Sequence, residues 1–139
     1  MKIKNLILFA ALMMMFGVVN AQTNTTWTPV LVNVDGTNTF KGIEVYYSLS
    51  TCGTNEVVFL KLVNTNAKAM KAQWINDVVT NDTKEHYGNT KLVSVNINAN
   101  SEVIGTCNSK VKELIVKLKE YKVEAKDFNT IVGSSFYAE

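Results

Sequence analysis

The chain contains no arginine, so all of its basic side chains apart from one histidine are lysines. Arginine is the side chain best suited to bidentate recognition of phosphates and base edges, and its absence argues against nucleic-acid binding. The lysines are also scattered between acidic residues and form no basic run. We therefore expect no nucleic-acid partner.

The sequence is equally poor in the residues that carry catalysis. A hydrolase needs a nucleophile, a base and an orienting group that converge on one point. The single histidine, His86, lies in a polar stretch with no such pattern near it. Glycine-rich phosphate loops and Cys-x-x-Cys pairs are absent, and two cysteines with one distant histidine lack the close ligand spacing of a zinc site. We expect neither a cofactor nor a metal, and the pattern favours a protein that is not an enzyme.

Only one long apolar run occurs, and it lies at the amino end. Lys2 and Lys4 precede an apolar stretch over residues 6–16, which is followed by small residues ending at Ala21. This order is typical of a secretory signal peptide, and the run is about half of the roughly 20 residues that span a bilayer. We predict a signal peptide over residues 1–21, cleavage after Ala21, and export to the periplasm or beyond. The residue directly after the predicted cleavage site is Gln22 and not a lipid-carrying cysteine, so we expect no membrane insertion of the mature protein.

The predicted mature chain, residues 22–139, has the size of a single ordinary domain. Two of the 14 lysines belong to the signal peptide, so twelve remain against 12 acidic residues, and the mature domain is close to neutral. Its oligomeric state is left open by the sequence.

The two cysteines, Cys52 and Cys107, both fall in the exported part. Disulfides persist in oxidising compartments, and an even number of cysteines favours internal pairing. We predict one disulfide between them, with two free thiols or an intermolecular link as the alternatives.

Alternation of apolar and polar residues, which is typical of half-buried strands, recurs along the mature chain. It predicts strands over residues 27–34, 42–50, 56–64, 68–75 and 91–98, with a last strand near 128–137. Residues 110–121 fit either a strand or a helix, and the number of neighbouring strands favours a strand. About seven or eight short strands predict an all-β, antiparallel sandwich. Trp74 is expected in its core.

The strands over residues 42–50 and 56–64 predict a hairpin with a four-residue loop at Cys52–Asn55. One register makes a whole face apolar, since it pairs Leu49 with Val58, Tyr47 with Leu60, and Val45 with Leu62. A shift by one residue would set Lys61 against Val45.

This register turns Tyr46, Phe59 and Lys61 to the opposite face of the hairpin, with Tyr46 beside Lys61. Aromatic side chains around a lysine would form a contact surface for a partner. The alternative is that they are isolated exposed aromatics, or that a loop covers them.

Residues 76–90 are polar and lack a regular period, which predicts a long loop. It holds Asp77, Asp82, Glu85 and His86.

Several segments together resemble small exported proteins of unassigned function from Bacteroidetes. They are Gly42–Tyr47, Cys52-Gly53, Val57–Asn64 and Trp74, with the Asn-Ala-Gln junction at the cleavage site. The resemblance covers about two-thirds of the mature chain and implies an immunoglobulin-like sandwich without implying an activity. Immunoglobulin domains set their cysteines within facing strands, whereas Cys52 is expected in a turn.

We therefore expect an exported, non-enzymatic module that binds a protein, a glycan or a cell-surface component. The alternative is a small secreted enzyme, or enzyme inhibitor, with its site in the loop over residues 76–90.

Overall fold

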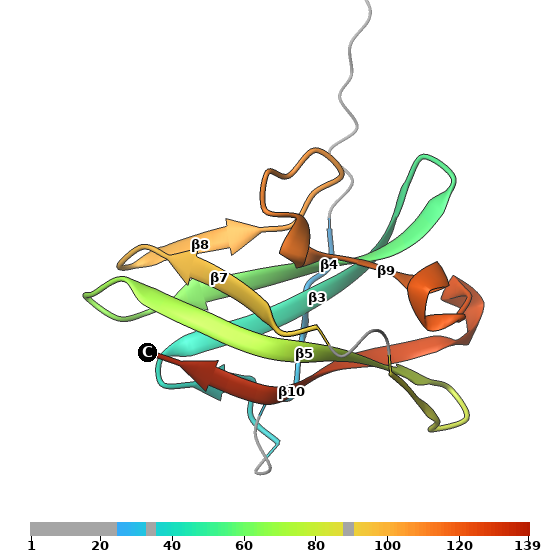
Figure 1. The fold of residues 1–139 in the computed structure, drawn as a ribbon, viewed down its shortest axis with the longest axis horizontal. Coiled ribbons are helices and arrows are strands. Elements are labelled where there is room, and N and C mark those ends of the chain that lie inside the picture. Colours follow the sequence, from blue (N-terminus) through green and yellow to red (C-terminus); the bar gives the residue numbers. More distant parts are fainter. Residues whose placement is uncertain (1–24, 33–35, 88–90) are drawn as a thin grey trace, which may run out of the picture.

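A computed structural model describes residues 25–32, 36–87 and 91–139 (Figure 1). Two antiparallel sheets pack face to face, so the predicted all-β sandwich is confirmed. The predicted signal peptide over residues 1–21, and with it the cleavage site, lies outside the described residues. Within the described ranges, no helix has the length and apolar character needed to cross a membrane.

The larger sheet is built around the hairpin of β3 (Ile43–Cys52) and β4 (Asn55–Asn64). On the free side of β3 lie two short strands, β1 (Thr28–Pro29) and β2 (Thr39–Phe40), which pair with it one after the other. On the free side of β4 lie β8 (Ser101–Ile104) and β9 (Ile115–Lys117), again end to end. The six strands therefore occupy four positions.

The smaller sheet has β5 (Met70–Thr80) at its centre. β10 (Phe128–Ala138) pairs along one side of β5, and β6 (Glu85–Tyr87) and β7 (Val93–Ile97) share the other side. The ten described strands thus fill seven positions, which agrees with the seven or eight predicted from the sequence. Three 3-10 helices, η1 (Lys112–Leu114), η2 (Leu118–Tyr121) and η3 (Ala125–Asp127), flank β9 and lead into β10.

The core lies between the two sheets and follows from the period-2 alternation of both central hairpin strands and β5. Trp74 of β5 is 2% exposed, as predicted for a core residue. Its indole Nε1 donates a hydrogen bond of 2.7 Å to Oδ1 of Asn76, two residues along the same face. A buried tryptophan needs such a partner for its one polar group. Facing it across the sandwich are buried aliphatic side chains of the larger sheet, including Ile43, Leu60 and Leu62.

The predicted hairpin register is confirmed. Leu49 pairs with Val58, Tyr47 with Leu60, and Val45 with Leu62. The turn is shorter than predicted, because pairing continues to Cys52 and Asn55 and leaves only Gly53 and Thr54 between the strands. Gly53 has a φ of 61°, the left-handed value that the first central residue of a type II′ turn requires.

Two segments differ from the sequence-based expectation. The predicted long loop over residues 76–90 is wrong: β5 continues to Thr80, and β6 begins at Glu85 after a tight turn. Over residues 110–121, only the three residues of β9 form a strand, and 3-10 helices replace the rest. The alternation expected there is nevertheless present, since Leu114, Val116 and Leu118 are all buried.

The first predicted strand, over residues 27–34, is also shorter than expected. Within its described part, residues 27–32, only Thr28 and Pro29 pair as a strand. Val30 follows with its amide hydrogen-bonded to the carbonyl of Val45 and its side chain buried, whereas Leu31 is 52% exposed. Proline cannot donate to a ladder, so its place at the sheet edge matches its chemistry.

A buried asparagine closes one end of the sandwich. Asn64, at the end of β4, is 1% exposed. Its Nδ2 donates to the carbonyl oxygens of Lys68 at 2.8 Å and Asn98 at 3.0 Å, while its Oδ1 accepts from the amide of Asn66 at 3.0 Å. One side chain therefore connects the turn after β4 with the turn after β7.

Candidate functional site

The outer face of the larger sheet carries the most distinctive group of side chains in the described residues. Leu60 and Leu62 of β4 point into the core, so Lys61 between them points outward. Directly opposed residues of paired strands share a face. Tyr46 opposes Lys61, and Phe59 opposes Ser48, so Tyr46, Lys61 and Phe59 all lie on the outer face, each half-buried. This is the placement predicted from the sequence.

Lys61 lies against two aromatic rings that come from two other segments of the sheet. Its Nζ is 4.7 Å from the ring centroid of Tyr46 on β3 and 5.1 Å from that of Trp27, just before β1. Each cation–π contact of this kind contributes about 0.5–1 kcal/mol at a partly exposed site. The ammonium thereby links β4, β3 and the amino-terminal segment on one face. We call Trp27, Tyr46, Phe59 and Lys61 the contact surface.

Trp27 was not among the residues predicted for this surface. Thr28 pairs with Tyr47, so Trp27 lies level with Ser48 and on its face of the sheet. The signal was present in the sequence: Val30 and Val32 were expected to point inward, and the alternation then places Trp27 outward. The approach of Trp27 to Lys61 could not be predicted in the same way, because it depends on the long-range pairing of β1 with β3.

The phenol of Tyr46 is fixed by an acid on its own strand. Its hydroxyl donates a hydrogen bond of 2.7 Å to Oε2 of Glu44. This hydrogen bond, with a smaller contribution from burial, raises the pKa of Tyr46 above its ordinary value of 10.0. The hydroxyl is therefore protonated at physiological pH, and the ring is held in one orientation beside Lys61.

Apolar side chains border the contact surface on the side of β8 and β9, while Glu44, Glu102 and Lys117 also lie on this face. Phe59 opposes Ile115 of β9, and Lys61 opposes Ile104 of β8, which is 37% exposed. Val57 is only 1% exposed although it points to this same side. An apolar, aromatic surface of this kind on a sheet face is what protein and ligand interfaces use.

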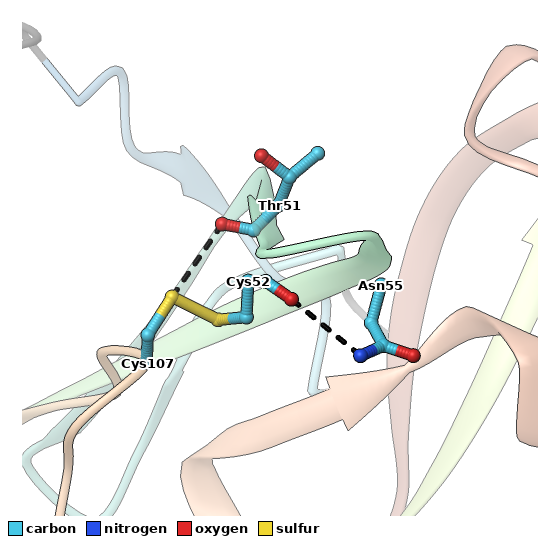
Figure 2. The surroundings of a disulfide bond; sticks show 4 residues. All are labelled: Thr51, Cys52, Asn55 and Cys107. Atoms are coloured by element: carbon cyan, nitrogen blue, oxygen red, sulfur yellow. Dashed lines mark hydrogen bonds between the residues drawn. A yellow bond between two sulfur atoms is a disulfide. The ribbon is translucent and has the colours of Figure 1, made fainter.

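The predicted disulfide between Cys52 and Cys107 is confirmed (Figure 2). Their Cα atoms are 5.4 Å apart, within the usual range for a disulfide. The bond connects the tip of the β3–β4 hairpin to the loop between β8 and η1. It lies at the hairpin tip on the outer face of the larger sheet, because Cys52 alternates in step with Tyr46 and Ser48 on β3. The disulfide of immunoglobulin domains instead joins the two facing sheets.

The residues proposed for an alternative site over residues 76–90 fall into different structural settings. Asp77 lies on β5 and is 6% exposed. Asp82 lies in the turn, where it accepts a hydrogen bond of 2.6 Å from Thr80 and forms a salt bridge of 2.7 Å with Lys84. These contacts, led by that with Lys84, lower the pKa of Asp82 to about 2. The side chains of Glu85 and His86 lie outside the described residues.

A cleft of about 370 Å³ opens where β7 and β9, the edges of the two sheets, diverge. Val93, Val116 and the ring of Tyr121 line it, with lysine and glutamate side chains around them. The hydroxyl of Tyr121 donates to the carbonyl oxygen of Asn76 at 3.3 Å. Burial, and then the nearby carboxylates of Asp77 and Glu120, raise the pKa of Tyr121 to about 12.

Across the ranges that the structure describes, no three His, Cys, Asp or Glu side chains lie close enough together to hold a metal ion. In comparisons with known proteins, no family model, no curated protein and no solved structure matches this chain.

Proposed function

We propose that this chain is an exported, non-enzymatic module that binds a protein, a glycan or a cell-surface component through the contact surface. The observation that carries the proposal is the position of Lys61, whose ammonium lies against the rings of Tyr46 and Trp27 on the face turned away from the core. Aromatic side chains provide a large contact area at low entropic cost, and they dominate the energetics of binding surfaces.

Lys61 also retains polar capacity for a partner. None of the salt bridges among the described residues includes Lys61. Its ammonium can therefore donate to a carboxylate, a carbonyl or a sugar hydroxyl of a bound molecule without breaking an existing ion pair. A surface that combines aromatic rings with one such donor suits specific recognition more than non-specific binding.

Export is supported by the amino-terminal pattern, by the disulfide and by the resemblance to exported Bacteroidetes proteins. A disulfide is stable in an oxidising compartment and rare in the cytosol of most organisms. The near-neutral charge of residues 22–139 suits recognition by shape and ring contacts more than by long-range attraction.

The test is a binding screen of the exported protein against a panel of polysaccharides and purified envelope proteins. Replacing Tyr46 or Lys61 by alanine should lower the affinity for any ligand found by about tenfold or more, which is the loss typical of central interface residues. The matched control is Tyr137→Ala, because Tyr137 lies on the other sheet with its own lysine, Lys41, 4.9 Å from its ring. Equal binding by all three variants would contradict the proposal, and turnover of a panel substrate would favour the enzyme alternative.

A further inference from the structure

We infer that the cleft between β7 and β9 binds a free α-amino acid with an apolar side chain. The site is separate from the contact surface, because the cleft opens between the two sheets whereas the contact surface lies on the outer face of the larger sheet. The inference is therefore independent of the proposed function. The cleft volume of about 370 Å³ lies at the lower end of the range for small-ligand sites, about 300–1,000 Å³.

A buried side-chain amide supplies the cleft with a hydrogen-bond donor. Asn76 of β5 is 9% exposed and lines the cleft. Its Oδ1 accepts the indole hydrogen of Trp74, which fixes the orientation of the amide and turns Nδ2 away from the indole. No described residue accepts a hydrogen bond from Nδ2, and the described side chains leave no fully buried polar atom unpaired, so Nδ2 reaches the cleft. A donor in such a place calls for an acceptor oxygen on a bound molecule.

Apolar groups lie beside this donor. Val93 of β7 and Val116 of β9 line the cleft from the two sheets, together with the ring of Tyr121 on η2. The Tyr121 hydroxyl donates to the backbone carbonyl oxygen of Asn76 at 3.3 Å, which holds the ring close to the amide. A small apolar group bound here would leave water for contact with these side chains. The ligand therefore combines an apolar part with an acceptor oxygen.

The charged side chains around the cleft are of both signs. Lys91 and Lys112 line it together with Glu113 and Glu120. Neither lysine takes part in a salt bridge between described residues, so both ammonium groups can pair with a carboxylate. Glu120 forms an exposed salt bridge of 3.6 Å with Lys117, which contributes little and leaves the carboxylate accessible. This balance favours a ligand that carries both charges.

Negative charge lies close to the Asn76 donor. After burial, the carboxylates of Asp77 and Glu120 are the causes that raise the pKa of Tyr121 to about 12, so both lie near its hydroxyl. The same hydroxyl contacts the backbone of Asn76. A cationic group is therefore favoured beside the place where the donor needs an acceptor oxygen. An α-amino acid meets both requirements, because its ammonium and its carboxylate are attached to one carbon atom.

Each part of such a ligand has a counterpart in the cleft. The carboxylate accepts from Nδ2 of Asn76 and pairs with Lys112, while the ammonium pairs with Glu120. The apolar side chain packs against Val93 and Val116.

Isothermal titration calorimetry of the exported protein with L-leucine, L-valine and L-phenylalanine tests the inference. Two analogues of leucine separate the contributions of the charges: isocaproate lacks the ammonium, and isoamylamine lacks the carboxylate. At least one of the amino acids should bind. For leucine, each analogue should bind at least about tenfold more weakly, because each leaves a charged group of the cleft unpaired. The absence of binding by all three amino acids would overturn the inference, as would an analogue that binds as tightly as leucine.

Variants of exposed residues locate the site without disturbing the core. Lys112→Gln and Glu120→Gln should each lower the affinity for the amino acid by about tenfold, and both proteins should fold because these side chains are exposed. The matched control is Glu124→Gln. Like Glu120→Gln, it removes an exposed salt bridge, here of 2.9 Å to Lys126, but Glu124 does not line this cleft. Its affinity should equal that of the wild type.

Asn76→Asp tests the donor itself. The variant keeps an oxygen acceptor for the indole of Trp74 and replaces the Nδ2 donor by an oxygen, so binding should fall by at least about tenfold. In the wild-type protein, the side-chain amide NMR signal of Asn76 should shift as the amino acid is added. An Asn76 amide signal that stays in place at saturation, or equal affinity in the wild type and in Lys112→Gln and Glu120→Gln, would overturn the inference.

Discussion

Lys61 and Asn64 lie three residues apart on β4, and each connects parts of the chain that are distant in sequence. Lys61 points outward and contacts Trp27 and Tyr46, whereas Asn64 points inward and bonds to the turns after β4 and β7. Alternation along one strand thus places a binding residue and a structural residue almost side by side. Their chemistry separates them: the first holds its charge at the surface, and the second satisfies buried backbone groups.

Replacing Asn64 by alanine should lower the free energy of unfolding by about 3 kcal/mol. The change leaves the carbonyls of Lys68 and Asn98 and the amide of Asn66 without their partner, and a buried unpaired polar group costs about 1–3 kcal/mol. Chemical denaturation measures the effect. Asn96→Ala, at an exposed position of β7, is the control and should change stability by less than about 0.5 kcal/mol. Equal stabilities would show that Asn64 does not close this end of the sandwich.

Tyr121 should make stability depend on alkaline pH. Its pKa is raised to about 12 in the folded state from an ordinary value of 10.0, so the folded state favours the protonated phenol. The stabilisation is complete below pH 10 and is lost as the pH rises through about 12. In a titration followed by phenolate absorbance, Tyr121→Phe should remove one of the last tyrosines to ionise. Loss of an early-ionising tyrosine would contradict the assignment.

The sequence was sufficient to place Tyr46, Phe59 and Lys61 on one face of the hairpin, because the register followed from pairing apolar residues across two long strands. It could not reveal the contact of Lys61 with Trp27, since that depends on a third segment pairing through only two residues. The role of Asn64 was also hidden, because asparagine is abundant in this chain and nothing local distinguishes a buried one.

At the scale of elements, the alternation of apolar and polar residues predicted strands well, whereas polar residues within a strand led to a wrong prediction of a loop. Asn76 and Asp77 suggested a loop, yet both are buried in β5. Tertiary contacts overrode their low strand propensity, since Asn76 accepts the indole hydrogen of Trp74 on one face. Residues 110–121 fit both the helical and the strand period in sequence. In the structure they form the short strand β9 between the 3-10 helices η1 and η2.

The disulfide should be a large part of the stability of the domain. It joins residues 55 apart in sequence, and closing such a loop contributes at most about 4 kcal/mol in the chain-entropy estimate. Reduction should therefore lower the melting temperature by about 10 °C. A Cys52→Ser/Cys107→Ser variant provides the control, because its melting curve should not respond to reductant. Identical curves for the wild type with and without reductant would contradict the estimate.

At the scale of the whole molecule, the sandwich could be predicted because so many short alternating segments leave few other architectures for a chain of this length. The sharing of one sheet position by two short strands could not be predicted, because it depends on long-range pairing. It occurs three times: for β1 with β2, β6 with β7, and β8 with β9. That arrangement places β8 beside Lys61 and β9 beside Phe59, so both strands border the contact surface.

The exported protein should begin at Gln22. The prediction follows from the apolar run over residues 6–16 and the small residues that end at Ala21. The intact mass of protein recovered from the periplasm of an expression host should correspond to residues 22–139. A mass that retains Met1, or one that includes a lipid, would contradict the assignment of the compartment.

Trp27 allows the most direct test of the contact surface, because the chain has only two tryptophans and the other, Trp74, is buried in the core. Labelling with fluorotryptophan gives one fluorine NMR signal for each. If the outer face of the larger sheet binds the partner, the signal of Trp27 should shift or broaden as association proceeds, while that of Trp74 stays in place. An unchanged Trp27 signal under conditions where sedimentation shows that the partner is bound would contradict the account.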